Sequence, residues 1–226
     1  MRHIAHIRSD FPTKFGIPRQ AGLVEGLRAR VVFAPEFRAP EALRGIEGFS
    51  HLWLLWEFSQ NRRAGWSATV RPPRLGGNTR MGVFATRSPF RPNPIGLSCV
   101  RLERVEWEGT EGPVLHVSGA DLMDGTPIYD IKPYIPYADS HPEAACAFPR
   151  PDPAGRLRVD IPAELLALVP EADRVVLEGV LAQDPRPAYQ DDPDRVYGFG
   201  FAGLEVGFQV RDGVLRVTRI RPGQDR

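Results

Sequence analysis

The hydrophobic residues in the first half of the chain fall into short runs that predict β-strands. Residues 27–33 alternate apolar side chains with Arg28 and Arg30, which is the period of a half-buried strand. Residues 51–58 are apolar on both faces, so we expect a strand in the middle of a sheet. The same reasoning predicts further strands at residues 3–7, 67–71, 80–86, 95–105 and 114–118.

Helical periodicity is rare in this half. One helical turn is predicted at residues 41–45. Short strands between Gly/Pro turns are typical of a β-barrel or a sandwich, and they argue against alternating βαβ units. Residues 121–139 are rich in proline and are expected to form a loop.

The second half has a different pattern. Residues 148–155 (FPRPDPAG) resemble a linker. Helices are predicted at 163–169 and 174–181, and strands at 204–210 and 214–220. Asp212-Gly213 between these strands is a strong signal for a two-residue hairpin turn. We therefore predict a mainly β protein whose N-terminal domain is residues 1–147 and whose small α+β C-terminal domain is residues 156–226.

Composition is that of a soluble globular chain. It has 226 residues, a 42% hydrophobic fraction and a net charge of +1. The N-terminus MRHIAHIRSD has no apolar run, so no signal peptide and a cytoplasmic location are expected. Cys99 and Cys146 lack the spaced partners of a zinc site, and each is expected to be a small buried side chain. No metal is predicted.

Positive charge is concentrated in one stretch. From residue 62 to residue 102 there is no Asp or Glu, while the arginines are Arg62, Arg63, Arg71, Arg74, Arg80, Arg87, Arg91 and Arg101. Guanidinium groups bind phosphate and carboxylate bidentately, and nearby prolines stiffen the backbone that carries them. The stretch predicts a surface for a polyanion or a nucleotide; the alternative is a solvated arginine-rich face.

A GxGxxG pattern at residues 198–203 invites a dinucleotide-binding interpretation. That fingerprint needs a strand before it and a helix after it, whereas a strand-like run follows here. We therefore interpret these glycines as a bulge or a close backbone approach.

Several long blocks together resemble one known family. They are KFGIPRQ, GFSHLWLLWEF, the arginine-rich RPPRLGGNTRMGVFATRSPFRPNPIGLS, DLMDGTPIYDIKPYIPYADS, and QDPRPAYQ with RVYG. In this order they are similar to the tRNA N6-threonylcarbamoyladenosine methyltransferases called TrmO, TsaA or YaeB-like. The resemblance implies a single-sheeted β-barrel that binds S-adenosylmethionine, a homodimer, and the anticodon loop of tRNA as substrate, with no role for DNA or a membrane.

The resemblance also assigns cofactor-binding residues. They are Pro18, Arg19, Gln20, Ser59, Gln60, Arg87, Leu97, Asp121, Leu122, Met123 and Asp124. Residue chemistry alone leaves plainer alternatives for them: a turn with solvated side chains at 18–20, a strand cap at 59–60 and an Asx-turn at 121–127.

The acceptor nitrogen of such a substrate is a poor nucleophile until it loses a proton, so a base is expected. The candidate catalytic residues are Asp124, Tyr129 and Asp130. The candidate tRNA contacts are Arg71, Arg74, Arg80, Arg91, Lys132, Arg186 and Tyr189. An internal ion pair between Asp130 and Lys132 is an equal alternative, as is a packing role for the loop at 184–190.

The predicted function is methyl transfer from S-adenosylmethionine to N6 of threonylcarbamoyladenosine next to the anticodon. One alternative is a non-catalytic RNA-binding module that uses the same arginine-rich face. Another is a phosphate-ester hydrolase, although the sequence displays neither a metal cluster nor an activated nucleophile for it.

Overall fold

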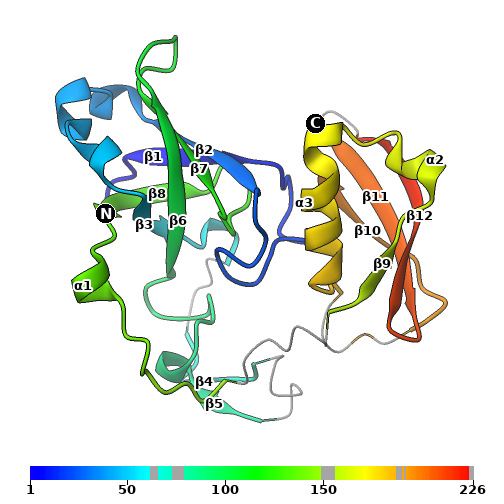
Figure 1. Ribbon diagram of the computed structural model, residues 1–226. Coiled ribbons are helices and arrows are strands. Elements are labelled where there is room, and N and C mark those ends of the chain that lie inside the picture. The colour runs from blue at the N-terminus through cyan, green and yellow to red at the C-terminus, as the bar shows by residue number, and fades with distance from the viewer. Residues whose placement is uncertain (62–65, 73–78, 149–155, 187–189, 191, 224–226) are drawn as a thin grey trace.

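The N-terminal part of the chain forms a closed six-stranded antiparallel barrel in the order β1-β2-β7-β6-β3-β8 (Figure 1). The computed structural model describes residues 1–61, 66–72, 79–148, 156–186, 190 and 192–223. The barrel strands are β1 (Ala5–Ser9), β2 (Arg28–Phe33), β3 (His51–Glu57), β6 (Ile95–Glu106), β7 (Val114–Ser118) and β8 (Pro127–Pro133). The predicted mainly β architecture with a single-sheeted barrel is confirmed.

Strand β3 illustrates how alternation builds the barrel. Leu52, Leu54 and Trp56 are buried inside it, while the outward residues between them are half-buried. The strand pairs with β6 on one side and β8 on the other, which confirms its predicted central place. Together with the inward residues of the other strands, these side chains make one continuous apolar core.

Short elements decorate the barrel. The 3-10 helices η1 (Pro35–Phe37), η2 (Pro40–Leu43) and η3 (Ile46–Gly48) lie between β2 and β3, and η4 (Ser59–Asn61) follows β3. A two-stranded hairpin pairs β4 (Thr69–Val70) with β5 (Met81–Gly82), and η6 (Val83–Ala85) follows directly. Helix α1 (Pro136–Asp139) follows β8.

Two predictions for the first half are wrong. Residues 80–86 are not one strand, because the Val83 N–H bonds the Ala68 carbonyl and the chain then curls into η6. Residues 121–139 are not a loop throughout, because β8 closes the barrel there. Pro127 and Pro133 occupy the first and last positions of β8, where a missing N–H interrupts little of the ladder.

The C-terminal part is a four-stranded sheet in the order β10-β11-β12-β9, as Figure 1 shows. Its elements are β9 (Arg158–Asp160), α2 (Ala163–Leu166), α3 (Glu171–Ala182), β10 (Tyr197–Phe201), β11 (Leu204–Arg211) and β12 (Val214–Pro222). Asp212 and Gly213 both have positive φ, at 50° and 73°, which confirms the predicted hairpin turn. The sequence reading missed β9 and β10.

Of the two interpretations offered for the glycines at 198–203, the close approach is observed and the bulge is not. β10 pairs with β11 in regular register, and a Cβ at Gly200 would lie 2.6 Å from the Pro12 side chain. Gly198 and Gly200 lie within β10, and a tight turn at Ala202-Gly203 leads directly into β11. No helix follows, so the dinucleotide fingerprint lacks its helix N-terminus.

The segment between β1 and β2 joins the two parts of the molecule. Its side chains Phe11, Val24 and Leu27 pack in the hydrophobic core that the C-terminal sheet forms with α3. In Figure 1, α3 lies between the barrel and that sheet. The domain limits 1–147 and 156–226 stay a prediction, and the predicted linker falls mostly on residues outside the described ranges.

Both cysteines are free, and Cys146 is exposed rather than buried as expected, whereas Cys99 is half-buried on β6. Among the described residues, no group of three or more His, Cys, Asp or Glu side chains is arranged to hold a metal ion. No helix in the described ranges is long and apolar enough to cross a bilayer.

Candidate functional site

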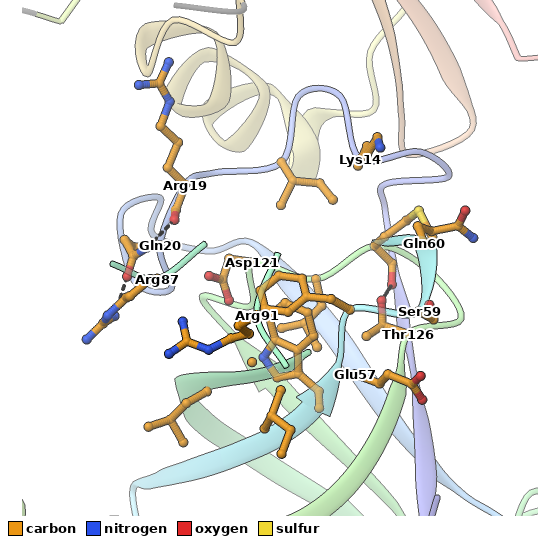
Figure 2. Close-up of a pocket in the computed structure, with 18 of the residues that line it drawn as sticks. Lys14, Arg19, Gln20, Glu57, Ser59, Gln60, Arg87, Arg91, Asp121 and Thr126 are labelled. Carbon is orange, nitrogen blue, oxygen red and sulfur yellow. Dashed lines mark hydrogen bonds between the residues drawn. The ribbon is translucent and has the colours of Figure 1, made fainter. Parts of the chain in front are cut away.

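A cavity of about 650 Å³ opens at one end of the barrel (Figure 2). Four segments that are distant in sequence line it: residues 14–20, 56–60, 86–97 and 121–126. Its size falls within the range of roughly 300–1,000 Å³ that small-molecule and cofactor pockets occupy.

The barrel topology explains why these segments meet. Glu57 at the end of β3 pairs with Ile95 at the start of β6, and the Phe58 N–H bonds the Pro94 carbonyl at 2.9 Å. The long excursion between those strands therefore begins and ends at this rim. The connection from β7 to β8 and the one from β1 to β2 reach the same rim, where the Gly22 N–H bonds the Gly119 carbonyl at 2.9 Å.

A buried hydrogen-bonded chain positions one carboxylate in the cavity. The Trp56 indole N–H donates to the Ser98 hydroxyl at 2.9 Å, and that hydroxyl donates to Asp121 Oδ1 at 2.5 Å. Trp56 lies over Gly96, where a Cβ would be 2.2 Å from the ring. Any larger residue at position 96 would displace the indole, so the glycine is required for this chain to form.

Burial raises the pKa of the Asp121 carboxyl. The Ser98 hydrogen bond, the backbone N–H groups of Asp121 and Ala21 and the positive charge of Arg87 lower it in part. The hydrogen bonds and Arg87 therefore offset only part of the cost of burying the negative charge. A cationic or hydroxyl-bearing ligand beside the carboxylate would offset more of that cost.

We expect Ser98→Ala to raise the pKa of the Asp121 carboxyl further, because the donated hydrogen bond stabilises its ionised form. The substitution also leaves the buried Trp56 N–H without its acceptor, which costs about 1–3 kcal/mol of unfolding free energy. NMR titration of labelled aspartate carboxyls measures the first effect, and chemical denaturation measures the second. Ser67→Ala is the control, because that hydroxyl donates to the Thr69 carbonyl instead; equal behaviour of the two variants would contradict the assignment.

Polar side chains link the loop after β1 to the arginine-rich stretch. Arg87 donates to the Gln20 side-chain oxygen, and the Gln20 amide donates to the Arg19 carbonyl at 2.5 Å. Arg91 donates to the carbonyls of Thr86 and Ser88 at 3.0 and 3.3 Å, which braces the turn that carries Arg87. Figure 2 shows Arg19, Gln20, Arg87, Arg91 and Asp121 on the same side of the cavity.

Most predicted cofactor residues line this cavity. They are Pro18, Arg19, Gln20, Ser59, Gln60, Arg87, Leu97, Asp121, Leu122 and Met123. Asp124 lies apart from the lining, where its carboxylate accepts the Ser9 N–H at 3.0 Å and pairs with Arg8 at 3.6 Å.

The other predicted residues are more scattered. Tyr129 packs against the His3 ring, with centroids 4.9 Å apart, and Asp130 pairs with Lys132 at 3.2 Å; none of these lines the cavity. The ion-pair alternative for Asp130 and Lys132 is thus observed. Arg91 lines the cavity, whereas Arg71 and Arg80 are exposed beside the β4–β5 hairpin.

In the C-terminal part, Arg186 makes two hydrogen bonds of 2.9 Å with the Asp184 carboxylate. This contact lies within the loop itself, so both the tRNA contact and the packing role for residues 184–190 stay predictions. Arg74 and Tyr189 lie outside the described residues.

Sequence reasoning missed several residues that form the site. The lining also includes Lys14, Ile17, Trp56, Glu57, Phe58 and Thr126, and Ser98 supports it from behind. The alternation of β6 was a usable signal, since it places Gly96 and Ser98 on the inner face beside the predicted end of β3.

Comparison with known proteins agrees with these motifs. The family described as tRNA-methyltransferase O N-terminal domain matches residues 6–140, and the family described as TrmO C-terminal domain matches residues 155–223. The chain belongs to the TrmO family. The resemblance that the motifs indicated is confirmed.

Individual TrmO relatives match over nearly their whole length. The tRNA (adenine(37)-N6)-methyltransferase of Escherichia coli (strain K12) is 43% identical over 227 residues, covering 97% of this chain and 96% of the relative. A Pseudomonas aeruginosa protein provisionally named S-adenosylmethionine-dependent methyltransferase RcsF is 43% identical over 229 residues, with 97% and 96% covered. The crystal structure of TrmO from Pseudomonas aeruginosa superposes with a TM-score of 0.76 at 37% identity and covers 97% of each chain.

Proposed function

We propose that this protein is a tRNA methyltransferase that moves a methyl group from S-adenosylmethionine to N6 of threonylcarbamoyladenosine beside the anticodon. The observation that carries the proposal is the cavity at the barrel rim. It gathers, from four separate segments, nearly all the residues that the family resemblance assigns to the cofactor. The names of the Escherichia coli and Pseudomonas aeruginosa relatives support the reaction class and the methyl donor.

The lining has the chemistry that this cofactor requires. Asp121 supplies a half-buried carboxylate for a ribose diol or for a positive charge, and Arg19 and Arg87 supply guanidinium groups for the amino-acid carboxylate. Ile17 and Leu97 give an apolar surface for the adenine ring. When bound, S-adenosylmethionine supplies an electrophilic methyl group on a cationic sulfur.

The contribution of the protein to such a transfer is chiefly orientation. The Trp56–Ser98–Asp121 chain and the Arg87–Gln20 bond fix polar groups in the cavity wall before any ligand enters. Holding two reactants at near-contact distance removes a large entropic part of the barrier. A base role for Asp124, Tyr129 or Asp130 stays a prediction. All three lie outside the cavity lining: Asp124 pairs with Arg8, Tyr129 packs against His3, and Asp130 pairs with Lys132.

The arginine-rich stretch would receive the tRNA. Its described arginines include Arg71 and Arg80 on the exposed hairpin side and Arg91 in the cavity wall. Phosphate contacts of this kind position an RNA without reading its sequence and weaken steeply with salt. A homodimer and a cytoplasmic location, both implied by the resemblance, stay predictions.

Methyl transfer into two tRNA pools tests the proposal. One pool carries threonylcarbamoyladenosine and the other is unmodified transcript; radiolabelled S-adenosylmethionine is the donor. We expect label only in the modified pool. Label in neither pool, together with salt-sensitive tRNA binding, would overturn the proposal in favour of a non-catalytic RNA-binding module.

A further inference from the structure

Two aromatic rings lie in contact on the surface beside the cavity. Trp66 is 55% exposed and Phe84 is 71% exposed, and their ring centroids are 6.1 Å apart with planes inclined by 33°. Complete burial of such a ring contributes about 1.5–3 kcal/mol, and these two rings forgo a part of it. Adjoining exposed apolar side chains are typical of a surface that binds a partner. We call Trp66 and Phe84 the ring pair.

The backbone that carries the ring pair is anchored. Strands β4 and β5 pair through Thr69 with Gly82 and Val70 with Met81, and the Val83 N–H bonds the Ala68 carbonyl at 2.9 Å. Val83 is 1% exposed, so it fixes the hairpin to the protein while its neighbour Phe84 faces solvent. The rings are therefore presented from a fixed frame.

The positive charge of residues 62–102 indicates what kind of partner binds the ring pair. From residue 62 to residue 102 there is no acidic residue, and Arg71 and Arg80 are exposed on the same hairpin. A partner must be anionic and must also offer flat apolar faces. Unpaired nucleobases on a phosphate backbone combine both properties, and stacking on aromatic rings within a basic surface is how proteins bind single-stranded nucleic acid.

A second copy of this chain fits less well. A two-fold interface places the same patch of both subunits together, which would bring the arginines of this stretch against each other. Like charges facing each other oppose association.

The ring pair is also close to the cavity. Phe84 precedes the lining residues Thr86 and Arg87 by two and three positions. An extended chain spans at most roughly 3.6 Å per residue, so the Phe84 backbone lies within about 7 Å of the Thr86 backbone. A nucleotide next to one that enters the cavity can thus reach the ring pair.

We infer that Trp66 and Phe84 form a stacking platform for an unpaired base of the RNA substrate, flanking the nucleotide that enters the cavity. This inference rests on the proposed function. The ring pair holds the single-stranded loop, and the arginines hold its phosphates.

The test measures RNA affinity in variants of the ring pair. The probes are a single-stranded oligoribonucleotide with the sequence of a tRNA anticodon loop, a duplex of equal charge, and whole tRNA. Trp66→Ala and Phe84→Ala should each weaken binding of the single strand and of tRNA roughly 5- to 150-fold, the range for losing one base–aromatic stack. Duplex binding and the slope of affinity against salt should be unchanged, because no charge is removed.

Three controls make the result specific. Tyr137→Ala removes a ring that is 92% exposed on α1 and should leave RNA affinity unchanged. Trp66→Tyr and Phe84→Tyr should restore affinity because they keep an aromatic face, whereas Phe84→Leu should not. S-adenosylmethionine binding in every variant checks that the fold is intact.

Two results would overturn the inference. The first is RNA affinity of the alanine variants within twofold of wild type. The second is recovery of affinity by Phe84→Leu with a change of subunit number in light scattering, which would make the ring pair a contact between copies. If wild type itself neither binds tRNA nor transfers methyl, the proposed function fails; if it does both and the variants match it, the inference alone fails.

Discussion

Asp121→Asn should weaken S-adenosylmethionine binding roughly 10- to 150-fold while leaving the fold intact. The asparagine keeps the oxygen that accepts the Ser98 hydroxyl but loses the negative charge that faces the cavity. A hydrogen bond to a charged partner contributes about 1.5–3 kcal/mol, and each 1.4 kcal/mol is a factor of ten in affinity. Isothermal titration calorimetry measures the loss.

The same substitution should raise the melting temperature of the ligand-free protein at neutral pH. Burial raises the pKa of the Asp121 carboxyl above its value in the unfolded chain. A group of this kind contributes stability below its unfolded pKa, and that contribution is lost as the pH rises through its folded pKa. Asparagine does not ionise, so the variant should gain on wild type as the pH rises and should match it below roughly pH 4.

Asp124→Asn is the matched control for the loss of cofactor affinity. Asp124 lies outside the cavity lining, with Arg8 and the Ser9 N–H as partners. We expect its cofactor affinity to stay near that of wild type. A large loss of affinity in Asp124→Asn with none in Asp121→Asn would show that the wrong carboxylate has been assigned to the ligand.

The strands of the barrel could be predicted from their hydrophobic patterns. Residues 95–105 show a clear period of two and residues 51–58 are apolar on both faces, which predicted short strands in a barrel or a sandwich. The family resemblance then favoured the single-sheeted barrel. Strand β8 was missed because its two prolines suggested a loop. Only the pairing of β8 with β1 and β3 shows that those prolines sit harmlessly at its ends.

The motifs of the candidate site could be predicted from the sequence, but their convergence at one rim of the barrel could not. Pro18-Arg19-Gln20 and Asp121-Leu122-Met123 are unusual blocks, and resemblance placed them in a cofactor site. Their convergence depends on which strand ends share a rim, which periodicity does not reveal. The role of Ser98 was hidden for the same reason, since a serine within a strand acquires meaning only when Trp56 and Asp121 lie on either side of it.

Gly16→Ala should destabilise the protein by about 2–5 kcal/mol and displace the cofactor loop. Gly16 has φ +92°, where a side chain costs about 1–2 kcal/mol. Its Cβ would also lie 2.3 Å from the Phe199 ring, and such overpacking costs typically 1–3 kcal/mol. Because Ile17, Pro18, Arg19 and Gln20 follow directly, we expect the KM for S-adenosylmethionine to rise much more than the KM for tRNA.

Gly45→Ala separates the two causes of this loss. Gly45 has a similar φ of +88°, but a Cβ there meets nothing within 4 Å, so only the backbone cost of about 1–2 kcal/mol should appear. Phe199→Leu in the Gly16→Ala background should recover part of the stability and of the cofactor KM, because it trims the ring that the methyl group strikes. If the two glycine variants instead lose equal stability and the double variant recovers nothing, the contact with Phe199 does not fix the loop. A rise in cofactor KM confined to Gly16→Ala would mean that β10 of the C-terminal sheet sets the shape of a cavity built on the barrel.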